Sequence, residues 1–318
     1  MIGFNRPEMS KGLLDCIRPI RPTKLYFFVD GPRQDRNTDA EATRKVRETV
    51  KSIDWPCDLR TNFQKTNLGC GRGVSTAISW FFSHESHGIV LEDDIRPTMG
   101  FFRFENELLE RYKDDVRVGL ISGFNPYGFQ SDRRNSYHFT HDAEIWGWGS
   151  WARVWKDYTL DLNPYKTLKD QIINQHIHTK RLRKILKGAF DTIFADCQIT
   201  WDFQFFILLA AKDYLSIMPR RRLTTNVGNG DARAAHLTNP DYDPTVQCSV
   251  SDGDLPIIHP TSVELDLSAT RKTELRRSGK AAGALTFLGS KFPFLRSYFY
   301  AVGNIIERIC PALFRISW

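Results

Sequence analysis

Residues 88–97 read Gly-Ile-Val-Leu-Glu-Asp-Asp-Ile-Arg-Pro, and they place a cluster of carboxylates directly after a short apolar run. The apolar residues 89–91 are typical of a fully buried strand. Three acidic residues follow at once, namely Glu92, Asp93 and Asp94. Neighbouring carboxylates repel one another and lose hydration at a strand end unless a cation offsets their charge. Taken alone, the stretch fits either an acidic surface turn or a cation site.

The carboxylates indicate which class of cation would bind. Hard divalent ions such as Mg²⁺ and Mn²⁺ bind oxygen atoms, usually those of one or two carboxylates together with phosphate groups of a substrate. In open α/β sheets, ligands bind beyond the carboxyl ends of the strands. We therefore expect Mn²⁺ or Mg²⁺ as the cofactor, bound at Asp94, with Glu92 and Asp93 close to the substrate.

The pattern of the whole chain predicts the α/β fold class. Apolar runs typical of strands alternate with stretches in which apolar residues recur at helical spacing. This alternation indicates a mostly parallel sheet with right-handed crossover connections. Expected strands lie at 25–29, 59–63, 88–91, 116–121 and 214–218, and expected helices at 9–17, 40–53, 69–82, 101–112, 167–190 and 200–212. Only residues 1–4 are available to form a strand before the first helix, so either the first strand is short or the natural chain starts upstream.

The composition is that of a globular protein with one large core. The chain has 318 residues, of which 41% are hydrophobic, 25% charged and 13% aromatic. Its six cysteines include no Cys-x-x-Cys pair, which argues against a zinc site and favours a reducing compartment. No basic leader followed by an apolar run occurs at the N-terminus, so no secretory signal is expected. We expect a cytoplasmic protein.

The net charge of +7 is concentrated in the tail, residues 271–318, which hold nine Lys/Arg and two Glu. Residues 1–270 are therefore neutral, which argues against nucleic acid as a partner. The sequence predicts a folded body at 1–270 followed by this basic, aromatic tail. Its apolar runs are too short to span a bilayer as a helix. Aromatic and basic residues together suit an anionic membrane surface, with helices packed on the body as the alternative.

Two further strand ends carry polar side chains. Asn5-Arg6-Pro7 closes the first strand and Asp30-Gly31-Pro32 closes the second, so both should lie near the acidic strand end. A carboxylate can accept a hydrogen bond from a pyrimidine N3–H, and an arginine can bind a phosphate. We expect Arg6 and Asp30 to bind a nucleotide. Asp30 could equally be an ordinary turn aspartate before glycine.

Asp202 follows Trp201 and opens the expected helix at 200–212. A carboxylate across a pocket from a metal could act as a general base. The alternative is purely local, because acidic residues stabilise the N-terminus of any helix.

These features occur in an order that resembles the GT-A glycosyltransferases, and most closely the N-acetylglucosaminyltransferase I family and bacterial family-2-like sugar transferases. The resemblance covers about residues 1–240. It consists of six motifs in order, which are Asn-Arg-Pro, Asp-Gly-Pro, Asn-Leu-Gly-Cys-Gly, Leu-Glu-Asp-Asp, Trp-Gly-Trp-Gly-Ser-Trp and Trp-Asp.

The resemblance implies a role for each matching residue. Arg6 and Asp30 would contact the nucleotide. The run from Glu92 matches the Glu-Asp-Asp form of the DXD motif, in which the middle residue, Asp93, contacts the donor sugar and the last, Asp94, binds the metal.

Two more matches lie further along the chain. Asp202 matches the catalytic base, which gives a single in-line displacement and inversion at the anomeric carbon. His236 matches, more loosely, a histidine that closes over the diphosphate or metal. Should Asp202 prove not to be the base, Asp231 and Glu144 are the acidic residues to consider next.

The tryptophan-rich segment offers candidate walls for a sugar pocket. Aromatic rings present flat apolar surfaces, and interleaved glycines allow close approach of a ligand. We expect Trp146, Trp148 and Trp201 near the acceptor sugar, with core packing as the alternative for Trp146 and Trp148 and the preferred role for Trp151 and Trp155.

His176 and His178 are two residues apart on the expected helix at 167–190. Residues two apart on a helix do not share a face. The spacing therefore argues against a metal site formed by this pair.

The expected activity is metal-dependent, inverting transfer of a sugar from a nucleotide-diphosphate donor, most simply a UDP-sugar. The acceptor would be a saccharide or lipid-linked saccharide in bacterial surface polysaccharide synthesis, near the inner face of the cytoplasmic membrane. A sugar-nucleotide nucleotidyltransferase would instead begin with a Gly-x-Gly-x-Arg loop, which Asn5-Arg6-Pro7 does not match. A non-catalytic carbohydrate-binding protein would need neither the acidic strand end nor Asp202.

Overall fold

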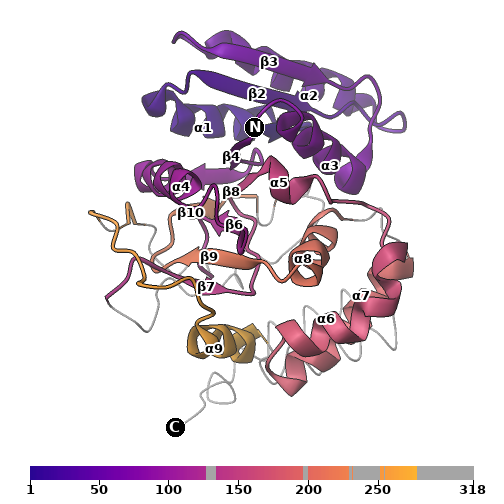
Figure 1. The fold of residues 1–318 in the computed structure, drawn as a ribbon. Helices are drawn as coiled ribbons and strands as arrows, with labels where there is room; N and C mark the ends of the chain where they lie inside the picture. The colour runs from indigo at the N-terminus through magenta and orange to yellow at the C-terminus, as the bar shows by residue number, and fades with distance from the viewer. Residues whose placement is uncertain (127–133, 196–199, 229–230, 232–250, 254, 278–318) are drawn as a thin grey trace, which may run out of the picture.

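A computed structural model describes residues 1–126, 134–195, 200–228, 231, 251–253 and 255–277. Within these ranges strands alternate with helices up to β6, so the α/β class is confirmed (Figure 1). Short 3₁₀ turns, η1 (Arg18–Ile20), η2 (Thr49–Ser52) and η3 (Asn163–Leu168), join some of the elements.

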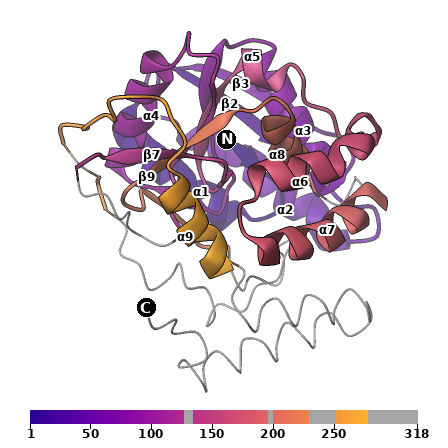
Figure 2. The ribbon, with the colours of Figure 1, turned by 60° about the horizontal axis from the view of Figure 1, so that its bottom comes forward.

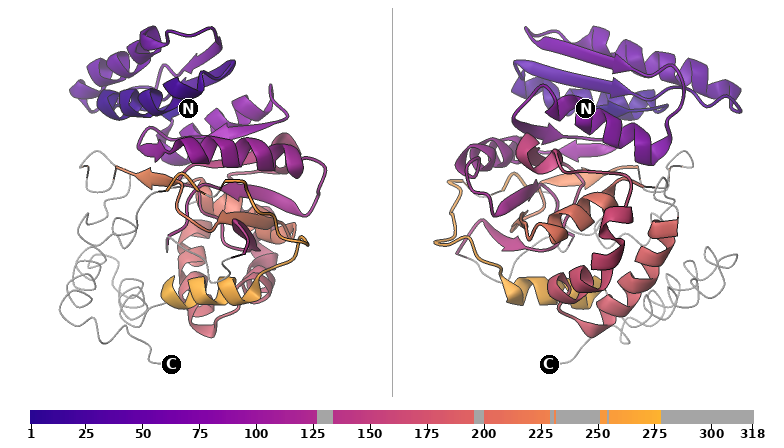
Figure 3. Two further views of the ribbon diagram at one scale, coloured as in Figure 1. Left: turned by 90° about the vertical axis from the view of Figure 1, so that its left-hand side faces the viewer. Right: turned by 45° about the vertical axis from the view of Figure 1, so that its right-hand side comes forward.

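The N-terminal layer is a three-stranded parallel sheet in the order β1-β2-β3 with helices on both faces (Figure 3). Successive side chains of β2 point to opposite faces. Phe27 packs with Val46 of α2, whereas the Tyr26 ring contacts Trp80 and Phe81 of α3. In chain order the elements are β1 (Ile2–Gly3), α1 (Pro7–Ile17), β2 (Lys24–Val29), α2 (Asn37–Glu48), β3 (Asp58–Phe63) and α3 (Gly69–Phe82).

The second sheet is mixed, with the order β4-β8-β6-β9-β7. Only β6 and β9 pair in parallel, so the expectation of a mostly parallel sheet is wrong here. The antiparallel strands β7 and β8, each four residues long, were not expected. For β8 the reason lies in its sequence, because glycine-containing Trp-Gly-Ser-Trp is a poor strand signal. The strands are β4 (His87–Val90), β6 (Val118–Ser122), β7 (Tyr137–Thr140), β8 (Trp148–Trp151) and β9 (Leu215–Pro219).

The main core lies between the second sheet and the helices that pack against it. Trp148 of β8 stacks on Trp201, with 5.8 Å between ring centroids, and on Phe205 of α8 at 5.2 Å. Trp151 of the same strand donates through Nε1 to the backbone oxygen of Leu109 on α4 at 3.1 Å. The helices involved are α4 (Met99–Arg111), α5 (Ala152–Trp155) and α8 (Asp202–Ala211).

The two sheets meet where β1 passes the end of β4. The Ile2 amide donates to the Leu91 carbonyl at 2.9 Å, and Ile2 forms an isolated parallel bridge with Glu92. Beyond this joint, β5 (Ile95–Pro97) pairs antiparallel with β10 (Thr224–Asn226). These pairings bring residues from three parts of the chain to one edge of the fold.

An elongated cavity of about 600 Å³ separates β2 from β4 on the other side of the joint. Met1 and Ile2 line one end, and the walls are largely apolar, including Leu25, Ile78 and Phe102. The Met1 ammonium donates to the Tyr26 carbonyl at 2.9 Å, and burial lowers the pKa of this amine to about 5. β1 itself has two residues.

The helix expected at 167–190 is in fact two helices, α6 (Lys169–His176) and α7 (Lys180–Ala195). The backbone leaves the helical conformation at Ile177, where ψ is 117°. The buried Glu274 carboxylate accepts hydrogen bonds from the amides of His178 and Thr179, which stabilises the break. His176 and His178 therefore do not share a helix, and helical spacing no longer separates their side chains.

Glu274 belongs to α9 (Leu267–Arg277), which crosses the expected boundary at 270/271. Thr270 and Glu274 of α9 are each 1% exposed, so the packed body extends into the expected tail. Figure 2 shows α9 lying across the face next to α6 and α7. No helix in the described part of the chain is long and apolar enough to cross a membrane. Residues 278–318, on which the membrane-surface prediction depends, lie outside that part.

Candidate functional site

The expected meeting of strand ends at one edge of the fold is present. Arg6 lies between β1 and α1, and its Nη2 donates to Oδ1 of Asp93 and, at 3.1 Å, to Oδ2 of Asp94. One guanidinium group thus forms hydrogen bonds with both aspartates of the acidic segment after β4. The side chain of Arg6 is 13% exposed, so this pair of contacts is largely shielded from water.

The acidic turn, residues 92–94, carries more negative charge than Arg6 offsets. Burial raises the pKa of Asp93 to about 7 despite its contact with Arg6, and its Oδ2 is buried without a hydrogen-bond partner. Burial, followed by the charges of Asp94, Asp93 and Asp202, raises the pKa of Glu92 to about 8. A bound cation would lower both pKa values by favouring the ionised carboxylates.

The turn is covered on one side by the residues that follow β10. Pairing of β10 with β5 carries the chain back over the acidic turn, where the Val227 amide donates to the Asp94 carbonyl at 2.8 Å. A Cβ atom at Gly228 would overlap Oδ2 of Asp94 and lie 2.8 Å from its Cβ. Glycine is therefore required there by space. Nothing in the sequence around Gly228 connects it to Asp94.

Asp30 is buried and hydrogen-bonded at the end of β2. Its carboxylate accepts from the amides of Gly31 at 2.8 Å and Leu68 at 2.9 Å, and from Nδ2 of Asn67 at 3.0 Å. Burial raises the pKa of Asp30, and the backbone hydrogen bonds oppose that shift. The carboxylate thus anchors the loop that precedes α3. Its expected contact with a nucleotide stays a prediction.

Cys70 is a site residue that the sequence did not single out. Burial, followed by the charges of four carboxylates, raises the pKa of its thiol to about 12; the carboxylates are those of Glu92, Asp202, Asp30 and Asp94. Cys70 is the second residue of α3, which begins at Gly69 with a φ of 78°. The N-terminus of this 14-residue helix faces the Asp30 carboxylate, which accepts from the amides of Leu68 and Gly69. The Gly-Cys-Gly motif at a helix start was the available signal.

Asp202 lies near the acidic turn, although 108 positions separate it from Asp94 in the chain. Its carboxylate contributes to the raised pKa of Glu92 and of Cys70. As the first residue of α8 it also accepts from the Phe203 amide at 2.9 Å and from the Thr200 hydroxyl. The position of Asp202 is therefore compatible with a role as general base and also with a purely local role at the helix N-terminus.

The three tryptophans expected near a sugar differ in exposure. Trp148 and Trp201 are 1% and 2% exposed inside the aromatic core, so for Trp148 core packing is what the structure displays. Trp146 is half-buried and packs on Phe124 at 4.5 Å between ring centroids, leaving part of its ring accessible. Trp151 and Trp155 are buried, as expected.

The acidic turn suits a hard cation, but it does not supply three converging ligands. Mg²⁺ and Mn²⁺ usually need only one or two protein carboxylates beside phosphate oxygens, which Asp94 and a neighbour could provide. The expected ligand His236 lies outside the described residues, whereas Asp231 follows the loop that covers Asp94. In the described ranges one group of three ligand atoms lies within 4.8 Å, in the His–Asp cluster of His141, His176 and Asp213.

No protein-family model matches this chain, and no curated protein matches it either. What the site can do is therefore inferred from its own residues. The site combines an acidic turn, an arginine that holds two of its carboxylates, the Asp30 carboxylate at the N-terminus of α3 and a further aspartate on a separate helix.

Proposed function

We propose that the protein is a metal-dependent, inverting glycosyltransferase with a GT-A catalytic domain and a nucleotide-diphosphate sugar as its donor. The observation that carries the proposal is the placement of Asp202 within electrostatic reach of the acidic turn at the edge where β1, β2 and β4 end. Ligands of open α/β sheets bind beyond such strand ends.

Donor binding is assigned to the residues around the acidic turn. Arg6 and Asp30 would hold the nucleotide. Asp94, with Asp93 or Glu92, would hold Mn²⁺ or Mg²⁺. When bound, the cation would offset the charge that develops on the departing diphosphate.

Asp202 is assigned as the general base. It would take the proton of the acceptor hydroxyl while the acceptor oxygen bonds to the anomeric carbon and the bond from that carbon to the diphosphate oxygen breaks. A single displacement of this kind inverts the anomeric configuration, by the same logic as base-activated attack in inverting glycosidases. Proton removal of this kind contributes about 10²–10⁴ in rate.

The acceptor is assigned as a saccharide or a lipid-linked saccharide. Trp146, which is half-buried, is the tryptophan of the three assigned to contact a sugar. The setting would be the synthesis of a bacterial surface polysaccharide in the cytoplasm, with the basic tail at the inner membrane surface.

The test is a thermal-shift screen of UDP-, GDP-, CMP- and dTDP-sugars, each with and without Mn²⁺, followed by assays of sugar release and transfer. We expect at least one nucleotide sugar to raise Tm in the presence of Mn²⁺. Asp94→Ala should lose that shift, whereas Asp114→Ala, at an exposed turn after α4, should retain it. If no nucleotide sugar stabilises the protein, or if Asp94→Ala responds like the parent, the proposal is wrong.

A further inference from the structure

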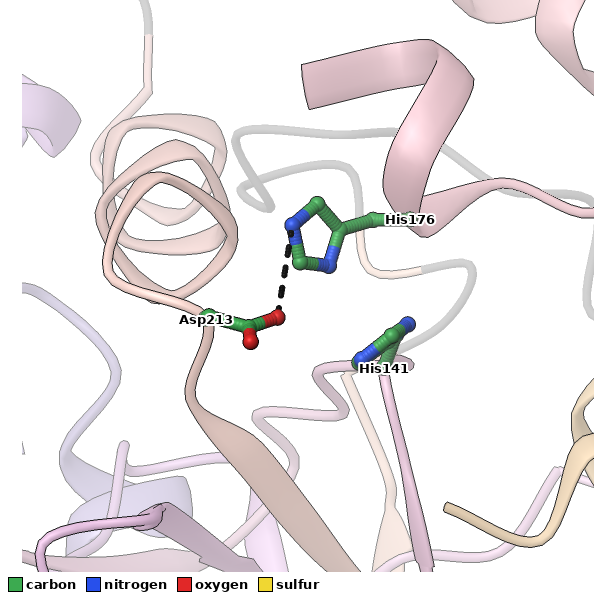
Figure 4. A group of neighbouring side chains, drawn as sticks. All are labelled: His141, His176 and Asp213. Atoms are coloured by element: carbon green, nitrogen blue, oxygen red, sulfur yellow. Dashed lines mark ion pairs between the residues drawn. The ribbon is translucent and has the colours of Figure 1, made fainter. Parts of the chain in front are cut away.

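The His–Asp cluster brings together side chains from three parts of the chain. His141 directly follows β7, His176 is the last residue of α6, and Asp213 lies between α8 and β9. Figure 4 shows the three side chains pointing toward one another. Asp202 begins α8 and Asp213 lies beyond its end, so about 15 Å of helix separates the cluster from the acidic turn.

The spacing of the ligand atoms is close to that of a tetrahedral metal site. Nε2 of His176 lies 3.8 Å from Oδ1 of Asp213, and the rings of His141 and His176 are 4.4 Å apart at 65°. Zinc bonds to nitrogen and oxygen measure about 2.0–2.2 Å, so two ligand atoms around tetrahedral zinc lie about 3.4 Å apart. Small side-chain rotations would shorten the 3.8 Å separation of Nε2 and Oδ1 to about 3.4 Å.

Hydrogen bonding leaves ring nitrogens of the cluster unsatisfied. His176 is 3% exposed, and its Nδ1 is buried without a partner, as is Nδ1 of His141. A buried polar atom without a partner is destabilising. The His178 ring, stacked on His141 at 5.6 Å, also has a buried nitrogen without a partner, its Nε2. Three imidazoles therefore meet in one place with unused nitrogen atoms.

Charge also favours a cation at this place. Burial lowers the pKa of both imidazoles, those of His141 and His176, and the neutral ring is the form that binds metals. Asp213 supplies the negative charge. Its backbone adopts a φ of 55°, a conformation that few non-glycine residues adopt.

We propose that His141, His176 and Asp213 bind a zinc ion, with water or His178 as the fourth ligand. Two histidines and one carboxylate form a known zinc ligand set, and imidazole nitrogen prefers zinc to the Mg²⁺ or Mn²⁺ expected at carboxylates. The ion would join β7, α6 and the α8–β9 connection. The scattered cysteines argued against a zinc site, but the ligand groups in this cluster are imidazoles and a carboxylate.

The test measures zinc in the full-length protein by elemental analysis after purification without chelator, and then Co²⁺ binding to the metal-free protein by visible absorption. We expect about one zinc ion per chain and the absorption of tetrahedral Co²⁺. His141→Ala and His176→Ala should each weaken binding by at least the factor of about 10–100 that is typical for loss of a residue supporting a ligand.

Three further variants keep the result interpretable. His138→Ala removes another buried histidine of β7 that is outside the cluster and should leave binding unchanged. Asp213→Asn removes the charge at an exposed position while asparagine tolerates the same backbone conformation, so this variant should fold and bind zinc less tightly. Asp94→Ala should retain the Co²⁺ signal. Absence of zinc and of Co²⁺ binding in the parent, or equal binding in Asp213→Asn and the parent, would overturn the proposal.

Discussion

The acidic turn and the His–Asp cluster are two groups of titratable side chains that differ in how they are assembled. The turn consists of consecutive residues at the end of one strand, whereas His141 and Asp213 are 72 positions apart in the chain. Burial shifts their pKa values in opposite directions, upward for Glu92 and downward for His141. In both cases burial disfavours the charged form.

Because their ligand atoms differ, the two groups should bind different kinds of cation. At the turn a cation must displace protons from carboxylates, and the oxygen ligands select hard ions such as Mg²⁺ or Mn²⁺. In the cluster burial favours the neutral imidazoles, and nitrogen ligands select zinc. The comparison therefore predicts two independent sites, one for chemistry and one for structure, which variants can separate.

The largest expected effect concerns Asp202, which the comparison assigns to the chemical site. Asp202→Asn retains the shape of the side chain but removes the basic carboxylate, so turnover should fall by about 10²–10⁴. Donor binding with Mn²⁺ should change little. Steady-state kinetics and calorimetric donor titration would measure the two quantities.

Two outcomes would contradict this assignment. Near-normal turnover in Asp202→Asn would exclude Asp202 as the base and direct attention to Asp231 or Glu144. A product that retains the anomeric configuration of the donor would contradict single displacement, whichever residue is the base.

The second prediction concerns β1, on which the chemical site depends and the His–Asp cluster does not. In the observed register Ile2 lies opposite Phe28 of β2. Three apolar residues added before Met1 would, in that register, lie opposite Lys24, Leu25 and Tyr26 and enter the cavity between β2 and β4. Burial of that apolar surface and removal of the amine from the cavity should raise Tm by about 5 °C.

Because the Met1 amine titrates, the stability gained from the extension should depend on pH. The pKa of the Met1 amine is about 5 in the fold against 8.0 normally, so the folded parent favours the neutral form and loses stability as pH falls from 8 to 5. The gain from the extension should therefore be larger at pH 5 than at pH 8. A Gly-Ser extension of equal length is the control, and equal Tm values for both extensions would contradict strand formation in the cavity.

Sequence reasoning predicted a group of carboxylates at a strand end, where the acidic residues are consecutive in the chain. Glu92, Asp93 and Asp94 follow an apolar run, and the parallel pairing of β1 with β2 brings Arg6 to the turn. The carboxyl ends of parallel strands lie at one edge of a sheet. The residues that follow each apolar run were therefore enough to predict which side chains lie at that edge. Local patterns predicted neither the antiparallel course of β7 and β8 nor the cover provided by Gly228.

The His–Asp cluster could not be predicted because it depends on a helix break with a distant cause. Helical spacing around residues 167–190 predicts one helix, and on one helix His176 and His178 would diverge. The break is stabilised by Glu274, which lies 96 positions beyond His178 and contacts its amide. Tertiary hydrogen bonds of this kind override local propensity.

The third prediction tests the close contact between Gly228 and the acidic turn. Gly228→Ala adds a Cβ that overlaps the Asp94 carboxylate, so Mn²⁺-dependent donor binding should weaken about tenfold, equivalent to about 1.4 kcal/mol. Gly188→Ala is the matched control, since a Cβ there meets no atom within 4 Å on α7. Zinc binding at the His–Asp cluster should be unchanged in both variants. Equal donor affinity in the two would show that Asp94 can move without loss of function.

The smallest expected effect concerns Glu105, a buried carboxyl group that belongs to neither cluster. Glu105 lies on α4 against β8, is 0% exposed, and has no hydrogen-bond partner for either oxygen. Burial alone raises its pKa well above the usual value of 4.5, so the folded protein holds the protonated form. The unfolded chain releases that proton above about pH 4.5, and stability should fall as pH rises from there.

Glu105→Gln removes this titration while keeping the size of the side chain, so the variant should gain stability relative to the parent as pH rises from 5 to 9. Urea unfolding at several pH values would measure the difference. Glu110→Gln, at an exposed position on the same helix, is the control and should give a small difference that does not grow with pH. A pH-independent difference for Glu105→Gln would mean that Glu105 is ionised in the fold. Burial would then fail to neutralise an isolated carboxyl group, and the raised pKa values of the acidic turn would have to come from repulsion among its own charges.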